Sequence, residues 1–176
     1  MRRLEPALKR IQFYDLWVCL RMNRALGHAL IGHAFRAISW LGNGLFWYAL
    51  MLALLAQYRA SAAGPVVHMA LVGIACTVCY KLLKQGTVRP RPYQVHEEIA
   101  VGAVPLDRFS FPSGHTLHAV AFTIVAGAHY PQLAPLLAIF TALTAASRVV
   151  LGLHYPSDVL AGAAIGALVA GMSLGI

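Results

Sequence analysis

Three short segments of the chain carry residue types that together can bind and attack a phosphate group. The first runs Lys84-Gln-Gly-Thr-Val-Arg-Pro-Arg91-Pro92, the second is Pro112-Ser113-Gly114-His115, and the third runs from Ser147-Arg148 to His154 and Asp158. They bring cations, two histidines, a carboxylate and a Ser-Gly turn into an otherwise apolar chain. Charge in such a chain is costly and usually functional, so these segments are the candidate site.

The cations Lys84, Arg91 and Arg148 are suited to surround a multiply charged oxyanion. Arginine presents a planar fork of N–H donors that matches phosphate, and lysine a compact point charge. The alternative is that each side chain only reaches lipid headgroups from the end of a membrane helix. Their presence beside two histidines favours a phosphate site. Arg89, in the same Arg-Pro-Arg-Pro stretch, fits either role.

The second segment predicts the beginning of a helix that faces an anion. Ser113 is a typical N-cap residue, so Gly114 and His115 would present backbone N–H groups at a helix N-terminus, which favours bound anions. Gly114 also lets a ligand approach the backbone closely. An ordinary capped helix explains Ser113 and Gly114 but leaves His115 without a purpose.

The third segment supplies a candidate nucleophile. Pro156 suits the first turn of a helix, so the Asp158 carboxylate is expected to accept the Nδ1–H of His154 and leave Nε2 free. We expect His154 to attack phosphorus in line, forming a phosphohistidine, and His115 to protonate the leaving oxygen. The three cations would balance the charge of the transition state. The motifs hold no carboxylate cluster for Mg²⁺ or Zn²⁺, so we expect neither a metal nor a cofactor.

The composition places these motifs in a membrane protein. Of 176 residues, 59% are hydrophobic and only 11% charged, with a mean hydropathy of +0.66. Soluble domains carry about a quarter of charged residues. The length fits one domain, residues 1–176, with five or six spans of roughly 20 residues each. A nucleic-acid partner is not expected, because it would require a soluble basic face.

The apolar pattern predicts an all-α membrane bundle of about six transmembrane or interfacial helices. Spans are predicted at 44–58, 65–83, 114–129, 132–150 and 157–175, with a long proline-rich loop over 85–112. Residues 1–40 form a basic interfacial segment or first helix, and residues 65–175 the motif-bearing core. Charges interrupt the apolar stretch 16–40, which fits either a poor span or an amphipathic surface helix. We favour a span.

Alternating spans bring the motifs to one end of the bundle. Lys84 ends one span and His115 begins the next, while Arg148 ends the following span and Asp158 begins the last. The basic N-terminal residues favour a cytoplasmic N-terminus by the positive-inside rule. These residues are Arg2, Arg3, Lys9, Arg10, Arg21 and Arg24. If 16–40 crosses the membrane, the motifs face the outside of a bacterial inner membrane, towards the periplasm or cell exterior.

Two further patterns leave roles to be assigned. The spacings Gly162-x3-Gly166 and Gly171-x3-Gly175 predict that the last helix packs closely against a neighbour. The long loop carries charged or polar residues near the site, for which a solvated loop is the simpler interpretation and headgroup selection the other. These are His96, Glu97, Glu98, Asp107 and Arg108. His118, one helical turn after His115, is interpreted as packing or as support for the site.

The three segments resemble the signature of the type 2 phosphatidic acid phosphatase (PAP2) superfamily. That signature reads Lys-x6-Arg-Pro, Pro-Ser-Gly-His and Ser-Arg-x5-His-x3-Asp, and every part is present over about residues 65–175. The resemblance implies a helical bundle and metal-independent removal of phosphate from a lipid phosphate or pyrophosphate. It implies these roles: Lys84, Arg91 and Arg148 bind phosphate, Ser113 and Gly114 complete the cradle, His115 is the acid, and His154 attacks with the help of Asp158.

The substrate and the acceptor stay open at this point. Among bacterial branches the chain looks like phosphatidylglycerophosphate or undecaprenyl pyrophosphate phosphatases, and a lipid A phosphatase is an alternative. A phosphotransferase would use the same residues. A non-enzymatic anionic-lipid binding or transport protein would keep the cations but would not require both His154 and Asp158. In each case the expected partner is a membrane lipid phosphate, and the sequence does not give the oligomeric state.

Overall fold

The computed structural model describes residues 5–105 and 107–176, and within these ranges all regular structure is helical. The helices are α1 (Glu5–Asn23), α2 (Ala29–Trp40), α3 (Phe46–Tyr58), α4 (Ala63–Gln85), the single turn α5 (Pro92–Val95), α6 (Gly114–His129), α7 (Ala134–Val150) and α8 (Pro156–Leu174). The predicted all-α membrane bundle is confirmed. Arg2 and Arg3 lie outside the described residues.

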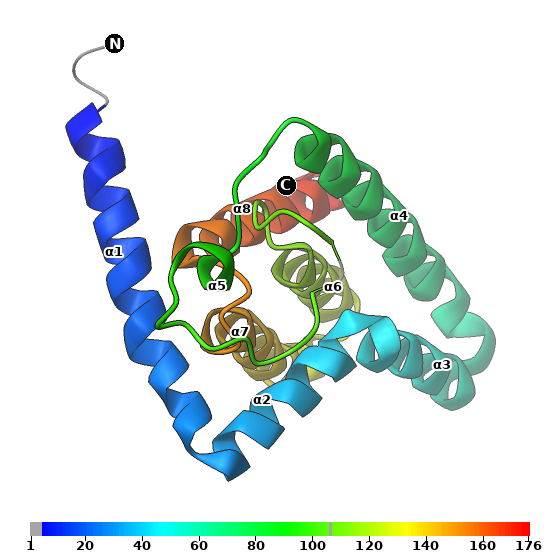
Figure 1. Ribbon diagram of the computed structural model, residues 1–176. Coiled ribbons are helices and arrows are strands. Elements are labelled where there is room, and N and C mark those ends of the chain that lie inside the picture. Colours follow the sequence, from blue (N-terminus) through cyan, green and yellow to red (C-terminus); the bar gives the residue numbers. More distant parts are fainter. Residues whose placement is uncertain (1–4, 106) are drawn as a thin grey trace.

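The interior of the bundle is built around α6. This helix packs against α8, α4 and α7, and Figure 1 shows α6 and α7 nearly end-on with the other helices around them. Three helical stretches of the described residues are long and apolar enough to cross a membrane: 29–85, 131–150 and 156–174. The first joins α2, α3 and α4.

The bundle has two ends of different character. At the far end, Tyr58 stacks on Tyr130, and His68 contacts His129 and Ser173. The other end, here called the motif end, holds the long loop 86–113. The helices α3, α4, α6, α7 and α8 each run between these two ends, so α4, α6, α7 and α8 bring their motif-bearing termini together as expected.

The structure corrects the expectation that residues 16–40 form one span. The helix ends at Asn23, and a 3-10 turn over Arg24–Gly27 separates α1 from α2. Three α1 side chains spaced four residues apart all reach the motif end: Asp15 accepts from Ser157 N, Cys19 Sγ approaches His154 O, and Asn23 donates to Val150 O. A stripe of buried polar groups needs such partners. Helix α1 therefore lies alongside the motif end, at the edge of the bundle (Figure 1).

Helix α2 also stays near the motif end. Its Arg36 donates to Gly102 O at 2.8 Å, and Ser39 accepts a hydrogen bond from Arg148. The chain then breaks at Gly42–Gly44 before α3 descends, with Gly44 at a φ of 113° that favours glycine. A Cβ at Gly42 would lie 2.8 Å from Thr144 Cγ2, so this glycine lets the break pack against α7.

Close packing of α8 against α6 sets the spacing of two motifs. A Cβ at Gly162 would lie 2.5 Å from Ser113 O, and one at Gly166 would lie 2.2 Å from Leu117 O. Only glycine permits this approach, so the prediction for the first small-residue pair is confirmed. The prediction is wrong for the second pair, because the nearest neighbour of Gly171 is the adjoining Ile176 and Gly175 faces open space.

Candidate active site

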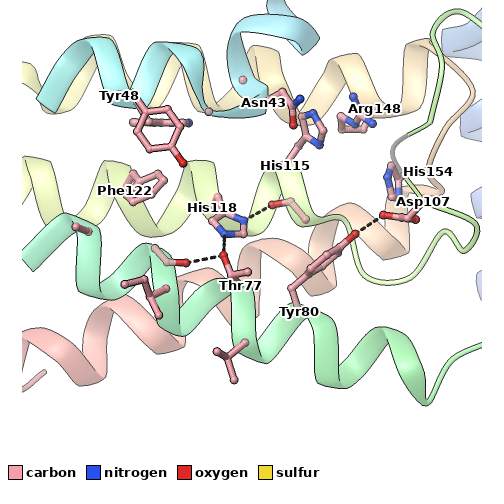
Figure 2. Close-up of a pocket in the computed structure, with 18 of the residues that line it drawn as sticks. Asn43, Tyr48, Thr77, Tyr80, Asp107, His115, His118, Phe122, Arg148 and His154 are labelled. Carbon is pink, nitrogen blue, oxygen red and sulfur yellow. Dashed lines mark hydrogen bonds between the residues drawn. The ribbon is translucent and has the colours of Figure 1, made fainter. Parts of the chain in front are cut away.

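The motif end gathers the sequence-predicted residues around one polar pocket, of which Figure 2 labels His115, Arg148 and His154. Arg91 and Gly114 also line this pocket, whereas Lys84, Ser113 and Asp158 lie outside its lining. Lys84 lies in the last turn of α4, His115 in the first turn of α6, Arg148 in the last turn of α7 and Asp158 in the first turn of α8. Arg91 and His154 come from the adjoining loops. Residues about seventy positions apart in the sequence are thus neighbours.

The cations Lys84 and Arg91 share one carboxylate, that of Asp107. Its Oδ1 accepts from Lys84 Nζ at 2.6 Å and from Arg91 Nη2 at 2.7 Å, and its Oδ2 accepts from the Tyr80 hydroxyl. Burial by itself raises the pKa of Asp107, but the hydrogen bonds from Lys84 and Tyr80 outweigh it, so the pKa lies below its ordinary value. The carboxylate is therefore ionised at neutral pH.

Arg91 connects this cation pair to His154. Its side chain is 1% exposed, and its Nη1 donates to Leu153 O at 2.7 Å and lies 3.2 Å from His154 Nε2. The Nε2 atom therefore carries a lone pair directed at the cations. Burial first, and then the charges of Arg148 and Arg91, hold the pKa of His154 well below its ordinary value. The imidazole is neutral at pH 7.

The pair His154 and Asp158 is close but not hydrogen-bonded. The distance from Nδ1 to Oδ2 is 3.9 Å, longer than a hydrogen bond, and within the described residues Nδ1 has no hydrogen-bond partner. Asp158 instead accepts from Arg89 Nη1 at 2.6 Å and from Tyr155 N at 2.8 Å. The direct contact expected from the sequence is thus absent in this arrangement, because the carboxylate is held by these two donors.

Ser113 and Gly114 begin α6 as predicted, with Ser113 as the N-cap. The Ser113 hydroxyl accepts from Thr116 N at 3.5 Å, and Ser113 N donates to Asp158 O at 3.1 Å, which ties two motifs together. A Cβ at Gly114 would lie 2.8 Å from the Tyr80 ring. The close approach that requires this glycine is therefore made by Tyr80, which carries the hydroxyl bound to Asp107.

His115 and Arg148 form the other side of the pocket. Figure 2 shows His115 between Asn43, which the break before α3 directs inwards, and Arg148. Arg148 is 3% exposed and donates to Ser39 Oγ, while its Nε has no partner among the described atoms. A buried guanidinium with an unused donor is suited to bind an anion. His118 contacts Gly114 O and Thr77 Oγ1 and so links α6 to α4.

These polar groups form one end of a cavity of about 540 Å³ whose remaining wall is largely apolar. Beyond His118 its wall is formed by side chains of α3, α4 and α6, among them Tyr48, Met51, Ile74, Val78 and Phe122. Several of these also face outwards: Tyr48 is 65% and Ile74 61% exposed. A polar end with an apolar continuation at the bundle surface is suited to a ligand with a charged headgroup and a lipid tail.

A second network of carboxylates lies outside the pocket lining and connects α1, the loop and the start of α8. Arg89 donates to Asp158, to Ser157 Oγ at 2.7 Å and to Asp15 Oδ2 at 2.7 Å, and its guanidinium lies over the Tyr155 ring. Asp15 also accepts from Ser157 N at 2.9 Å and from its hydroxyl at 2.5 Å. Arg89, whose side chain is 28% exposed, therefore belongs to this protein network, where it fixes the beginning of α8.

Sequence reasoning missed Asp15, Ser39 and Tyr80. A signal for Asp15 existed, because it is the single acidic residue between Glu5 and Glu97 and begins the polar spacing continued by Cys19 and Asn23. Ser39 and Tyr80 carry no comparable signal, since each is one hydroxyl in an apolar stretch. Their roles follow only from the contacts with Arg148 and Asp107.

We expect the variant Asp15→Asn to destabilise the protein by about 1–3 kcal/mol, because it removes the charge that pairs with Arg89. The apparent melting temperature in detergent measures this loss. Gln12→Ala, an exposed change on the same helix, is the matched control and should leave the melting temperature unchanged. Equal melting temperatures for wild type and Asp15→Asn would show that the network contributes nothing to stability.

A sequence profile of the PAP2 superfamily matches residues 62–175. The decaprenylphosphoryl-5-phosphoribose phosphatase of Mycobacterium tuberculosis is 39% identical over 88 residues, 50% of this chain and 48% of that protein. Undecaprenyl-diphosphatase BcrC of Bacillus subtilis is 36% identical over 95 residues, 54% and 49% of the two chains. The chain thus spans about half the length of these curated relatives.

A lipid A 1-phosphatase of Rhizobium johnstonii is 29% identical over 134 residues, 74% of this chain and 45% of that protein. Among solved structures, a PAP2-type phosphatidylglycerolphosphate phosphatase from Bacillus subtilis gives a TM-score of 0.78 at 24% identity, with 94% and 85% of the two chains covered. LpxE from Aquifex aeolicus gives 0.74 at 29% identity, with 85% and 88% covered. The likeness to the Bacillus subtilis structure, at 24% identity, establishes the fold alone.

The family match and the motifs coincide. The matched residues 62–175 make up more than half of the 176 residues and contain all three motif segments. The fold is shared over most of the chain with solved PAP2-type membrane structures. This membrane protein therefore belongs to the PAP2 superfamily.

Proposed function

We propose that the protein is a metal-independent phosphatase that removes phosphate from a membrane lipid phosphate or diphosphate through a phosphohistidine. The observation that carries the proposal is the position of His154 Nε2, 3.2 Å from Arg91 Nη1 at the polar end of an apolar cavity. A neutral imidazole beside fixed cations is suited to attack a bound phosphate. The phosphatases among the sequence relatives support the reaction type.

The proposed first step transfers the phosphoryl group to the protein. The lone pair of His154 Nε2 forms a bond to phosphorus while the bond from phosphorus to the lipid oxygen breaks, and His115 gives that oxygen a proton. In the second step water attacks the phosphohistidine, its proton goes to His115, and orthophosphate leaves. Lys84, Arg91 and Arg148 stabilise the equatorial oxygens in both steps.

Asp158 has a supporting part in this proposal. As N–P bond formation makes the imidazole positive, its Nδ1–H becomes a stronger donor, and a shift of about 1 Å closes the gap to Asp158 to hydrogen-bond length. The hydrogen bonds from Arg89 and Tyr155 hold the carboxylate ready on the correct side. Gly114 is proposed to complete the phosphate site with its backbone N–H at the start of α6. Ser113, whose own N–H donates to Asp158 O, is proposed to support the site as the N-cap of that helix.

We propose that no metal ion takes part, because fixed cations already occupy the positions that a metal would serve. The donor set agrees with this proposal: among the described residues no three His, Cys, Asp or Glu side chains gather in a metal-binding group. Charge neutralisation by Lys and Arg replaces the Lewis acid in such a site.

For the substrate we propose a polyprenyl phosphate or diphosphate, with phosphatidylglycerophosphate second. Two of the relatives act, by their names, on decaprenyl or undecaprenyl compounds. The apolar cavity wall formed by Ile74, Val78 and Phe122 suits an unbranched or prenyl tail equally well. A lipid A phosphatase, a phosphotransferase and a non-enzymatic lipid-binding protein are the alternatives, and the choice falls to product analysis.

We expect purified protein in detergent with EDTA to release orthophosphate from undecaprenyl pyrophosphate, and His154→Ala to lose at least about 10³-fold in rate, since the nucleophile is gone. Phosphate release from this lipid, phosphatidylglycerophosphate, phosphatidic acid and lipid A is measured in parallel. Acid-labile radiolabel retained on wild type after rapid quenching, and absent from His154→Ala, identifies the phosphohistidine.

His96→Ala, a change in the long loop outside the cavity lining, is the matched control and should keep its activity. Activity that EDTA abolishes and a divalent ion restores would contradict metal independence. Transfer of phosphate to a lipid or sugar hydroxyl would identify a phosphotransferase, and lipid binding without any turnover would identify the non-enzymatic alternative.

We infer the side of the membrane to which the site opens from the basic residues at the two ends of the bundle. The expectation of a site facing the periplasm of an inner membrane required residues 16–40 to cross, whereas α1 and α2 lie at the motif end. Basic residues Arg21 and Arg24 accordingly share the side of the site, while Arg59 connects α3 to α4 at the far end. The positive-inside rule applied to this arrangement favours a cytoplasmic site. We therefore propose a site that opens to the cytoplasm.

We expect a reporter fused after Ile176 to be external, because α8 runs from the motif end to the far end. Alkaline phosphatase, active only outside, should give a signal in this fusion, and a fluorescent protein that folds only inside should not. The reverse pattern would place the site in the periplasm and restore the first expectation.

A further inference from the structure

The two loop-side cations that the proposed function assigns to the substrate are already engaged by a carboxylate of the chain itself. Asp107 Oδ1 lies 2.6 Å from Lys84 Nζ and 2.7 Å from Arg91 Nη2. Arg91 Nε also donates to the backbone oxygen of Asp107 at 3.2 Å. One carboxylate oxygen shared between two cations is the arrangement expected of a bound phosphate oxygen.

Because Asp107 lies in the pocket, its carboxylate and a bound phosphate cannot contact the two cations at the same time. The residue lines the same cavity as His115, Arg148 and His154, and its carboxylate is seen beside His154 in Figure 2. A phosphate oxygen cannot approach Lys84 Nζ and Arg91 Nη2 along the same directions while Oδ1 is there. Binding of a phosphate to both cations therefore requires that the Asp107 side chain leave them.

We propose that Asp107 is an internal competitor for the phosphate-binding cations, an anion that keeps weakly bound, singly charged phosphodiesters off them and yields to a doubly charged terminal phosphate. The proposal rests on the proposed function, in which Lys84 and Arg91 bind the substrate phosphate. It assigns to the loop 86–113 a selective role that the solvated-loop interpretation of its charges does not contain.

The membrane setting gives this exclusion a purpose. Phospholipid headgroups are phosphodiesters with one negative charge on the phosphate, and they surround the protein at high local concentration. Without Asp107, Lys84 and Arg91 would be uncompensated cations in a pocket that these headgroups could enter. A terminal phosphate has a second pKa near 6 and carries almost two charges at neutral pH, so its attraction to the same cations is about twice as large.

The competition follows a simple relation. If Asp107 occupies the cations for nine-tenths of the time, the apparent Kd of every anion rises about tenfold. The factor is equal for both classes of anion, but the consequence differs. A tightly bound dianion still saturates the site, whereas a weakly bound monoanion no longer occupies an appreciable fraction of it. Tyr80 strengthens the competitor, because its hydroxyl donates to the second carboxylate oxygen.

The experiment compares wild type with Asp107→Asn, which keeps the shape of the side chain and removes its charge. Binding of orthophosphate and of dimethyl phosphate is measured by titration calorimetry in detergent at pH 8. We expect both Kd values to fall about tenfold in the variant, as removal of an internal competitor requires. Phosphatidylglycerol in mixed micelles, titrated in the absence of orthophosphate, should then occupy the variant at about tenfold lower concentration than wild type.

Two further variants complete the design. Glu97→Gln removes an exposed carboxylate from the same loop and should leave both Kd values unchanged. Tyr80→Phe removes the hydrogen bond to Asp107 without changing the charge. It should lower both Kd values, by a smaller factor than Asp107→Asn. If Asp107→Asn binds both anions more weakly than wild type, Asp107 orients the cations for the substrate and the proposal is overturned. Equal Kd values overturn it as well.

These outcomes are independent of turnover. A variant that binds anions more tightly in a protein that hydrolyses no lipid would support the selective role of Asp107 and reject the phosphatase. Lipid hydrolysis by wild type together with unchanged anion binding in Asp107→Asn would support the phosphatase and reject the role of Asp107.

Discussion

The structure depends on one constraint, the gathering of positive charge in an apolar bundle. Buried cations of like sign repel one another and lose their hydration, so they persist only where carboxylates or hydrogen-bond acceptors compensate them. Here the compensation is divided into two layers. Asp107, which lines the pocket, pairs with Lys84 and Arg91. Asp15 and Asp158, outside the pocket lining, pair with Arg89.

The helices are arranged so that each layer is complete. The glycines of α8 bring its first turn against Ser113, and this contact fixes Asp158 relative to the beginning of α6. Helix α1 lies alongside the motif end and contributes Asp15, although residues 62–175 alone match the family profile. The charge network thus includes a helix outside the matched region. A site built from four helix ends and two loops needs such ties, because each end frays when it is unpaired.

The sequence was sufficient for the class of fold and for the meeting of the motifs, and physical reasons limit what lay beyond. Alternating apolar spans necessarily bring Lys84, His115 and Arg148 to one end, so that prediction needed no tertiary information. The prediction of one span over residues 16–40 was wrong, because a helix that packs on the end of a bundle and a helix that crosses a bilayer can have similar hydropathy. The partner of Asp158 was equally hidden, since Arg89 is a local neighbour of Arg91 and the choice between them is made only by packing.

Arg148 separates structural charge from charge available to a ligand. Lys84, Arg91 and Arg89 each have a carboxylate within 2.7 Å, whereas among the described residues Arg148 is held by the hydroxyl of Ser39 and keeps an unused Nε donor. Its charge is therefore not cancelled locally, and it lies on the side of the pocket where His115 stands. A phosphate that reaches Arg148 meets a cation without a carboxylate partner, whereas its binding to Lys84 and Arg91 requires that it displace Asp107. The placement of the carboxylates thus leaves Arg148 to attract the anion and makes the compensated pair the place where the anion must compete.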